Sequence, residues 1–415
     1  MAEHVVKEAQ RCLQCKKPMC VEGCPVKTPI PEMIKLFLDG KSYEAGENLF
    51  LNNPLSVVCS LVCDHDRQCE GHCVQGRKGT PIHWSSIENY ISEAYLDRVG
   101  FDNVTKKGQK VAIIGSGPAG LTIAIDLARR GYDITVFDSR DKIGGVLRYG
   151  IPEFRLPKAL LDRYQKKLRD LGIKFRPNTT IGGALTIDDL FRDGYEAVQV
   201  GTGVWRPNTL GVVGESLGNV HYAIDYLVNP DGYELGDKVA IIGAGNAAID
   251  VARTAIRHGS RQVTVYARST KAAASEREVD YAIADGVQFK YGYNIKKITD
   301  EGPVFTKTTF DEEGNPVSYS EEALYNADST IISISQGPKD KIVASSNTEI
   351  ATTKKGLIWT NQQGETTREG VFASGDVVRG AKTVVEAVQA SKIVADAMDE
   401  YLTHKRENRS TGATA

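Results

Sequence analysis

Residues 110–138, "KVAIIGSGPAGLTIAIDLARRGYDITVFD", decide the fold of this chain. An apolar stretch leads into a glycine-rich turn, an apolar segment with helical periodicity follows, and a second apolar stretch ends in an acid. In the motif G-x-G-x-x-G the first glycine permits the tight turn, and the second lets the backbone approach a diphosphate. The third glycine brings the helix close to the strand. The stretch therefore predicts a strand–helix–strand unit that binds a dinucleotide at the helix N-terminus.

The acid that ends this unit is part of the predicted site. Asp138 lies 23 residues beyond Gly115, where a carboxylate accepts a hydrogen bond from a ribose hydroxyl. An α/β turn that binds no phosphate is the alternative interpretation. The residues expected in this first site are Gly115, Gly117, Pro118, Ala119, Gly120 and Asp138.

The same unit recurs at residues 238–268 as "KVAIIGAGNAAIDVARTAIRHGSRQVTVYAR". Alanine replaces the third glycine, which is a permitted variant. The second strand ends without an acid and is followed by Arg268 and Lys271, cations of the kind that a 2′-phosphate requires. This copy therefore predicts a site that favours NADP(H) over NAD(H), although Arg268 could also be a solvated loop cation. The expected residues are Gly243, Gly245, Asn246, Ala247, Arg268 and Lys271.

Two nucleotide sites in one chain predict a flavin in the first and a nicotinamide in the second. Near the C-terminus an apolar strand ends in Gly375-Asp376, and a helix begins near Thr383. The helix N-terminus suits the electron-rich edge of a reduced flavin, and Asp376 suits its ribityl chain. A role for Asp376 as a turn residue is the alternative. We expect Gly375, Asp376, Thr383 and Val384 to complete the flavin site.

All eight cysteines lie in two groups within residues 12–73. Zinc sites prefer C-x2-C pairs, and only Cys12 and Cys15 form one. A redox-active disulfide beside the flavin is excluded, because neither nucleotide-binding segment contains a cysteine. The run C-x2-C-x4-C-x3-C-P over residues 12–25 is a variant of the ferredoxin signature. We predict two [4Fe–4S] clusters, with a single cluster or zinc as alternatives.

These features, with "GGVLRYGIPEFRLPK" (144–158), "GAGNAAIDVARTAIRHG" (243–259) and "FASGDVVRGAKTVVEAV" (372–388), carry a family resemblance. The chain resembles the small subunit of bacterial glutamate synthase. It is also similar to the large subunit of NADH-dependent reduced ferredoxin:NADP oxidoreductase and to the N-terminal half of dihydropyrimidine dehydrogenase. The resemblance runs from Arg11 to about Leu402. Three departures are Ala267-Arg268, where the family often has an arginine pair, the stretch 272–275, which usually reads Met-Pro-Ala-Arg, and Ser335, which stands where a glycine is usual. The first two weaken phosphate recognition, so NAD(H) stays open as the alternative nucleotide.

The resemblance implies a set of ligands for the two clusters and adds Gly145 to the flavin site. The second cluster would include a carboxylate, and a harder oxygen donor in place of a thiolate alters a cluster's potential. Cys59 is left over and is interpreted as a small buried apolar residue. The implied ligands are Cys12, Cys15, Cys20 and Cys73 for one cluster, and Cys24, Cys63, Cys69 and Glu88 for the other.

The expected fold is an α/β protein whose helical N-terminal bis-[4Fe–4S] domain precedes two Rossmann-like domains in a disulfide-reductase-like arrangement. A net charge of −2 gives no indication of nucleic acid or a membrane surface, and no apolar run approaches the length of a membrane span. The N-terminal residues lack a secretory pattern, so a cytoplasmic location is expected. The expected segments are an iron–sulfur domain (1–104), the first part of an FAD domain (105–206), an NAD(P)H domain (207–325), the second part of the FAD domain (326–405) and a disordered tail (406–415).

The expected function is electron transfer between NADP(H) and a larger redox subunit that carries flavin or iron–sulfur groups. The cofactors carry the chemistry, so no catalytic acid or base is expected from the protein. Two alternatives remain at this point, a stand-alone NAD(P)H diaphorase and a cofactor scaffold without turnover.

Overall fold

The computed structural model describes residues 2–100, 104–339, 341–346 and 350–412, and the chain divides into two compact units. The first unit comprises Met1–Arg148, Glu153–Val204 and Pro338–Ala415, and the second comprises Tyr149–Pro152 and Trp205–Gly337. Within the described residues, every helix is too short or too polar to cross a bilayer.

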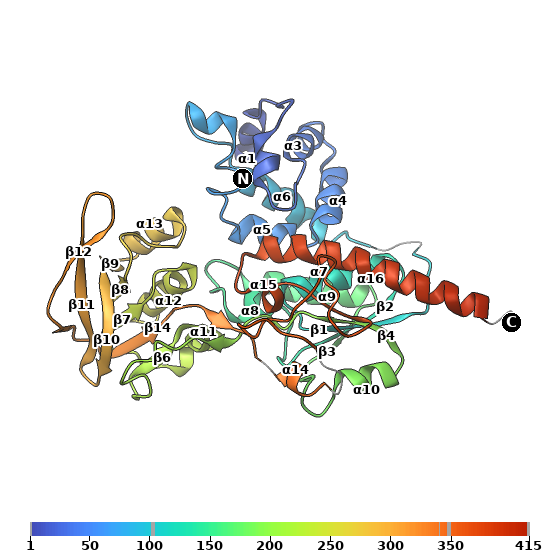
Figure 1. Cartoon of the computed structure of the whole chain (residues 1–415). Helices are drawn as coiled ribbons and strands as arrows, with labels where there is room; N and C mark the ends of the chain where they lie inside the picture. The colour runs from blue at the N-terminus through green and yellow to red at the C-terminus, as the bar shows by residue number, and fades with distance from the viewer. Residues whose placement is uncertain (1, 101–103, 340, 347–349, 413–415) are drawn as a thin grey trace. The chain divides into compact units, whose positions relative to one another are not determined.

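The N-terminal part of the first unit is helical (Figure 1). The long helix α6 packs against α4 and α5 and buries Ile87, Ile91 and Leu96. Most of the cysteines lie on the short connections between these helices, where the backbone can bend around a bound group. The elements are α1 (Ala2–Gln10), α2 (Met19–Gly23), α3 (Ile30–Leu38), α4 (Ser42–Asn52), α5 (Ser56–Val62), the 3-10 turn η1 (Val74–Arg77) and α6 (Trp84–Leu96).

A parallel five-stranded sheet with strand order β16-β4-β1-β2-β3 forms the rest of the first unit. Its strands are β1 (Lys110–Ile114), β2 (Asp133–Phe137), β3 (Lys174–Arg176), β4 (Tyr195–Val200) and β16 (Val371–Ala373). Its helices are α7 (Pro118–Arg129), α8 (Val146–Tyr149), α9 (Lys158–Asp170), α10 (Ile187–Arg192), α14 (Lys341–Ala344), α15 (Asp376–Arg379) and α16 (Val384–Gly412). The long helix α16 lies along α7 (Figure 1).

The second unit repeats this plan around a parallel sheet with strand order β6-β14-β7-β8-β9. The strands are β6 (Val220–Tyr222), β7 (Lys238–Ile242), β8 (Gln262–Ala267), β9 (Gln288–Tyr291) and β14 (Ser329–Ile332). Its helical elements are α11 (Ala223–Val228), η2 (Pro230–Gly232), α12 (Asn246–Arg257) and α13 (Glu276–Ala284). An antiparallel sheet contains β10 (Tyr293–Thr299), β11 (Gly302–Phe310), β12 (Pro316–Tyr319) and β13 (Ala323–Leu324), and β5 (Arg206–Pro207) pairs with β15 (Gln336–Gly337).

Two of the expected segment limits differ from the structure. The expected nucleotide domain ended at residue 325, but β14 pairs with β7, so the second unit continues to Gly337. The expected disordered tail from residue 406 is helical as far as Gly412, and residues 413–415 lie outside the described part. Contacts to Glu196 on β4 hold this polar end of α16, because Lys405 Nζ donates to its carbonyl oxygen (3.2 Å) and Arg409 pairs with its carboxylate (2.9 Å).

Candidate cofactor sites

The glycine turn after β1 has the close contacts that the motif predicts. Gly115 has φ +99°, and a Cβ there would lie 2.5 Å from the carbonyl oxygen of Gly201. A Cβ on Gly120 would lie 2.0 Å from the oxygen of Gly115 and 3.0 Å from Ile113 Cγ2. Gly117 is the N-cap of α7, so Pro118 and Ala119 form the first turn of that helix. The turn thus presents free backbone N–H groups at a helix N-terminus, where a diphosphate binds.

Asp138 holds this turn from the end of β2. Its Oδ2 accepts hydrogen bonds from the backbone N–H (2.7 Å) and the hydroxyl (2.5 Å) of Ser116, and its Oδ1 accepts from Arg140 N–H (2.9 Å). Each carboxylate oxygen has two lone pairs, so Oδ1 can accept a further bond from a ribose hydroxyl. The sequence analysis did not anticipate Ser116, because its role depends on the distance between two strand ends.

Two further loops approach the same turn. A Cβ on Gly145, which has φ +51°, would lie 2.8 Å from the Cα of Gly117. A Cβ on Gly375, which has φ +77°, would lie 2.8 Å from the Cβ of Ala119. Residues predicted from three separate motifs therefore meet at the N-terminus of α7. Side chains larger than hydrogen at these positions would fill the space that a dinucleotide requires.

The start of α16 is capped by its own residues. The backbone N–H of Thr383 donates to Glu386 Oε2 (3.0 Å), and Glu386 N–H donates to the Thr383 hydroxyl oxygen (3.4 Å), which is a capping box. Val384 is the first residue of the helix. Burial raises the pKa of Asp376 to about 7, and a buried carboxyl of this kind gains from hydroxyl donors such as those of a ribityl chain.

The turn after β7 is approached by the loop before α13, because Ala273 and Ala274 N–H both donate to the oxygen of Ala244 (2.9 and 3.0 Å). Gly243 has φ +112°, and a Cβ there would lie 2.1 Å from the oxygen of Ser333, yet a Cβ on Gly245 would meet nothing within 4 Å. Asn246 Oδ1 accepts from Ser275 N–H (3.2 Å), so this side chain links the turn to the loop before α13. Ala247 is part of the first turn of α12, and the predicted phosphate-binding cations Arg268 and Lys271 are both exposed.

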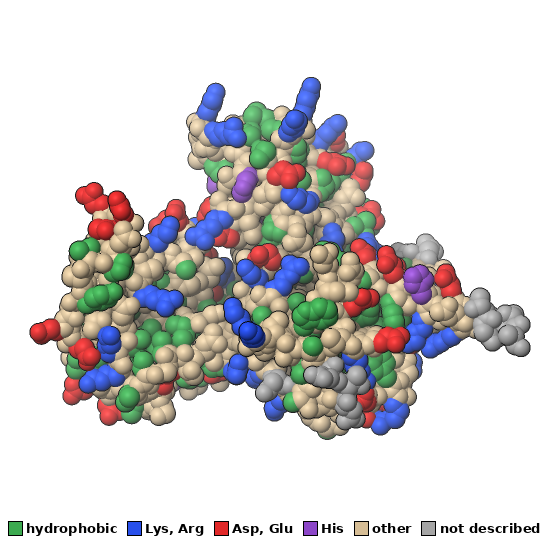
Figure 2. Space-filling view, in the orientation of Figure 1, with side chains coloured by type: hydrophobic (Ala, Val, Ile, Leu, Met, Phe, Trp, Pro, Cys, Tyr) green, Lys and Arg blue, Asp and Glu red, His purple; other side chains and the backbone are tan. Residues whose placement is uncertain are grey.

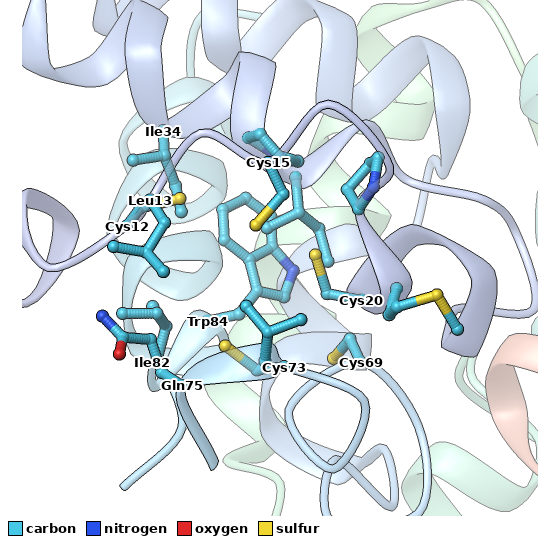
Figure 3. A pocket seen from close by; sticks show the side chains of 15 residues that line it. Cys12, Leu13, Cys15, Cys20, Ile34, Cys69, Cys73, Gln75, Ile82 and Trp84 are labelled. Atoms are coloured by element: carbon cyan, nitrogen blue, oxygen red, sulfur yellow. The ribbon is translucent and has the colours of Figure 1, made fainter. Parts of the chain in front are cut away.

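The first set of predicted cluster ligands surrounds one cavity of the N-terminal domain (Figure 3). The space between its atoms amounts to about 460 Å³, part of which is open to solvent. Burial raises the pKa of Cys12, and it raises that of Cys20 to about 11; neighbouring thiols add to both shifts. Trp84, which the sequence analysis did not single out, forms part of the wall. The cavity is lined by Cys12, Cys15, Cys20 and Cys73, by Cys69 from the other predicted set, and by apolar residues such as Ile34, Ile82 and Trp84.

Most of the second predicted set is buried, and Cys63 is half-buried. Cys24, Cys69 and Glu88 expose less than a tenth of their surface, and the pKa of Cys69 and of Glu88 is raised well above its usual value, mainly by burial. The Glu88 charge also raises the pKa of Cys24, Cys63 and Cys69, so all four groups act on one another. Four buried acidic groups are costly to ionise without a positive charge among them, which a metal centre would supply.

The arrangement of these donors suits a cluster better than a single ion. Among the residues that the structure describes, no three side chains of His, Cys, Asp or Glu converge closely enough to hold one metal ion. A zinc site needs four donors within about 2.0–2.3 Å of the same atom. An iron–sulfur cube binds one thiolate at each of four separate corners, so its ligands do not have to converge on one atom.

Two dinucleotide-binding folds joined to a thiol-lined helical domain define a flavin- and nicotinamide-dependent reductase with iron–sulfur chemistry. A family model for pyridine nucleotide-disulphide oxidoreductases matches residues 88–189 and 109–391. A second model, dihydropyrimidine dehydrogenase domain II with a 4Fe-4S cluster, matches residues 1–99.

Two relatives cover nearly the whole chain. The glutamate synthase [NADPH] small chain of Azospirillum brasilense is 33% identical over 98% of this chain and 90% of its own. The NAD-dependent dihydropyrimidine dehydrogenase subunit PreT of Escherichia coli (strain K12) is 32% identical over 96% of this chain and 94% of its own. FprA of Mycobacterium tuberculosis, solved in complex with NADPH, matches in fold with a TM-score of 0.60 at 15% identity, over 73% of this chain and 86% of that one.

The chain therefore belongs to the pyridine nucleotide-disulphide oxidoreductase family, in the group that contains the glutamate synthase small chains. The resemblance drawn from the motifs and the expected fold class are both confirmed. The protein is an electron-transfer oxidoreductase of flavin and pyridine nucleotide with a 4Fe-4S domain. Neither nucleotide-binding segment of the printed sequence contains a cysteine.

Proposed function

We propose that this chain carries electrons between NADP(H) and a larger redox subunit through FAD and two [4Fe–4S] clusters. When bound, the flavin exchanges a hydride with the nicotinamide and the clusters carry single electrons. The protein's residues bind and orient these groups and tune their charge environment. The observation that carries the proposal is that the two predicted ligand sets lie in the same compact unit as the glycine turn after β1.

In this proposal the cavity residues hold one cluster and the buried set around Glu88 holds the other. Thiols must lose their protons to bind iron, and burial opposes this in both sets, as the raised pKa values of Cys20 and Cys69 indicate. Iron binding compensates that cost, so loading with iron should release protons and stabilise the fold.

The decisive experiment is analysis of iron, sulfide and flavin in protein purified without oxygen. We expect about eight iron atoms per chain, four for each cluster, together with one FAD. Cys15→Ala should remove one cluster and Cys63→Ala the other, each leaving FAD bound. Cys59→Ala is the matched control at the left-over cysteine: its thiol lies within hydrogen-bonding reach of Cys63 but belongs to neither set, so this variant should keep all the iron. Full iron in Cys15→Ala, or zinc in place of iron, would contradict the proposal.

Reduction by the nucleotide tests the electron route separately. NADPH should bleach the flavin spectrum quickly and the cluster spectrum afterwards, because the nucleotide reacts with the flavin. A flavin that stays oxidised with both NADPH and NADH would contradict the proposal and favour a scaffold without turnover.

A partner surface is proposed around the mouth of the cysteine cavity. Leu13 and Met19 line the cavity and are 61% and 40% exposed, and the neighbouring Lys16 and Lys17 are also exposed. Hydrophobic side chains lie beside lysines and arginines on the visible face of this domain (Figure 2). Apolar residues rimmed by charge are typical of protein interaction sites, and electron transfer needs the partner close to a cluster.

This surface is tested by purifying tagged variants of the chain from cells that normally make it and identifying the proteins that co-purify. Leu13→Asp should lose a larger subunit carrying flavin or iron–sulfur groups, whereas Leu38→Asp, an equally simple change at an exposed leucine of α3, should retain it. Retention of that subunit by Leu13→Asp would place the interface elsewhere. We propose a cytoplasmic location for the complex, since the thiols must remain reduced to bind iron.

A further inference from the structure

Helix α16 reaches from the predicted flavin site to the loop that carries Cys24. Gln389 Nε2 donates to the carbonyl oxygen of Pro25 (2.8 Å). One turn further along, Lys392 Nζ donates to the backbone oxygen (2.6 Å) and to Oδ1 (3.0 Å) of Asn52. Residues three apart lie on the same face of a helix. One face of α16 is therefore fastened to the iron–sulfur domain at two points, about 8 Å and about 12 Å along the helix from Val384.

The Lys392 contact continues as a chain of hydrogen bonds to the Cys24 sulfur. Asn52 Nδ2 donates to Thr28 Oγ1 (3.2 Å), and Thr28 Oγ1 lies 3.5 Å from Cys24 Sγ. The Lys392 ammonium can only donate, and this fixes the donor and acceptor of each following hydrogen bond. Asn52 must turn its oxygen to Lys392 and its amide N–H to Thr28. The single O–H of Thr28 is then left for Cys24 when that sulfur is a thiolate.

This chain of hydrogen bonds is shielded from solvent at its Cys24 end. Thr28 is 2% exposed and Cys24 is 9% exposed. Lys392 is half-buried, and burial lowers its pKa. Charges that are partly removed from water are screened less than surface charges, and aligned hydrogen bonds strengthen one another. The positive charge of Lys392 is thus transmitted toward the sulfur of Cys24.

We propose that Lys392 is a positioning residue which, through Asn52 and Thr28, raises the reduction potential of the iron–sulfur centre bound by Cys24. Reduction adds negative charge to such a centre, and hydrogen bonds to its sulfurs together with a nearby positive charge stabilise that state. This inference rests on the proposed function, since it requires Cys24 to bind a cluster. It identifies residues that set the direction of electron flow without touching the iron.

The test is the midpoint potential of each cluster, followed by electron paramagnetic resonance in anaerobic redox titrations of the full chain. Lys392→Met should lower the ratio of reduced to oxidised centre about tenfold at a fixed potential, which is a shift of about 59 mV for one electron. Thr28→Val should shift the same centre in the same direction, and Thr28→Ser should restore it. The other cluster and the iron content should stay unchanged.

Lys405→Met is the matched control, because Lys405 lies on the same helix and donates to the oxygen of Glu196 instead. Unchanged potentials in iron-replete Lys392→Met and Thr28→Val would overturn the inference, as would an equal shift in Lys405→Met. If Lys392→Met does not fold, Thr28→Val with its serine rescue decides alone. Wild-type protein that lacks iron–sulfur signals would instead refute the proposed function.

Discussion

The two glycine turns of this chain start from the same strand sequence and end in different environments. Both β1 and β7 read KVAII, and each leads into a glycine with positive φ. In the first turn the loop at Gly145 approaches so closely that a Cβ there would lie 2.8 Å from the Cα of Gly117. In the second turn a Cβ on Gly245 would meet nothing within 4 Å, and the neighbouring loop bonds through its backbone, because Ala273 and Ala274 N–H donate to the oxygen of Ala244 (2.9 and 3.0 Å). The same local motif is thus approached by a glycine loop in the first unit and by a loop with side chains in the second.

This difference matches the two kinds of ligand that the proposed function requires. A prosthetic flavin must stay bound through many turnovers, and a turn covered by neighbouring loops slows its release. A nicotinamide nucleotide must enter and leave in each turnover, so the loop beside its turn must not hold it as tightly. In the proposed function the loops around the two turns therefore account for the difference, because the turns themselves are alike.

The largest effect is expected when a methyl group is added at the third glycine of the first turn. Gly120→Ala places a Cβ 2.0 Å from the oxygen of Gly115, so α7 must move away from β1, at a cost of about 3 kcal/mol. Urea unfolding should give a lower free energy of unfolding, and the protein should lose its flavin. Ala248 already occupies the same motif position in the second turn, so Ala248→Gly should cost only about 1 kcal/mol. Equal effects at the two positions would refute the comparison.

A smaller loss is expected when the first turn loses its carboxylate. Asp138→Ala removes the acceptor of three hydrogen bonds and leaves the N–H of Ser116 buried and unpaired. We expect a loss of about 2 kcal/mol in the free energy of unfolding and flavin that separates on gel filtration. The matching strand of the second unit ends in Ala267, where no carboxylate acts. Firm flavin retention by Asp138→Ala would show that the other loops hold the turn without it.

A change beside the second turn should weaken nucleotide binding and leave the stability of the protein unchanged. Arg268→Ala should raise the KM for NADPH about tenfold, which corresponds to about 1.4 kcal/mol for one charge-assisted bond to the 2′-phosphate. The KM for NADH and the melting temperature should not change. Arg261→Ala, which removes an exposed cation near the other end of the same strand, is the control. An equal loss with NADH would contradict recognition of the 2′-phosphate by Arg268.

The smallest effect concerns a matching pair of residues, one after β4 and one after β14. Three residues beyond β4 the first unit has Gly203 with φ +69°, and three residues beyond β14 the second unit has Ser335 with φ +73°. A side chain in this region of backbone space costs about 1 kcal/mol. Ser335→Gly should therefore stabilise the protein and Gly203→Ser should destabilise it by about the same amount, measured by urea unfolding. Destabilisation by Ser335→Gly or stabilisation by Gly203→Ser would contradict the equivalence of the two positions.

Much of each site could be predicted from the sequence because glycine motifs describe local backbone geometry. The turns after β1 and β7 lie where their motifs stand, and Thr383 caps α16 as expected for a helix start. The assignment of β14 to the second unit was missed, because strand pairing depends on residues about 90 positions apart, such as Val239 and Ser329. The helical end of α16 was missed because its anchors lie on β4. The ligand sets of the two clusters stay a prediction.

The sequence by itself determined which segments are strands, which turns can bind a phosphate and which residues can bind iron. Those properties depend on neighbours within a few residues, and the amino-acid order contains them directly. Only the tertiary structure decided that Gly145 packs on the first turn, that Ala273 and Ala274 bond to the second, and that Lys392 is connected to Cys24 through Asn52 and Thr28. Lys392 and Asn52 are 340 positions apart in the chain, and only the packing of α16 in the fold brings them into contact.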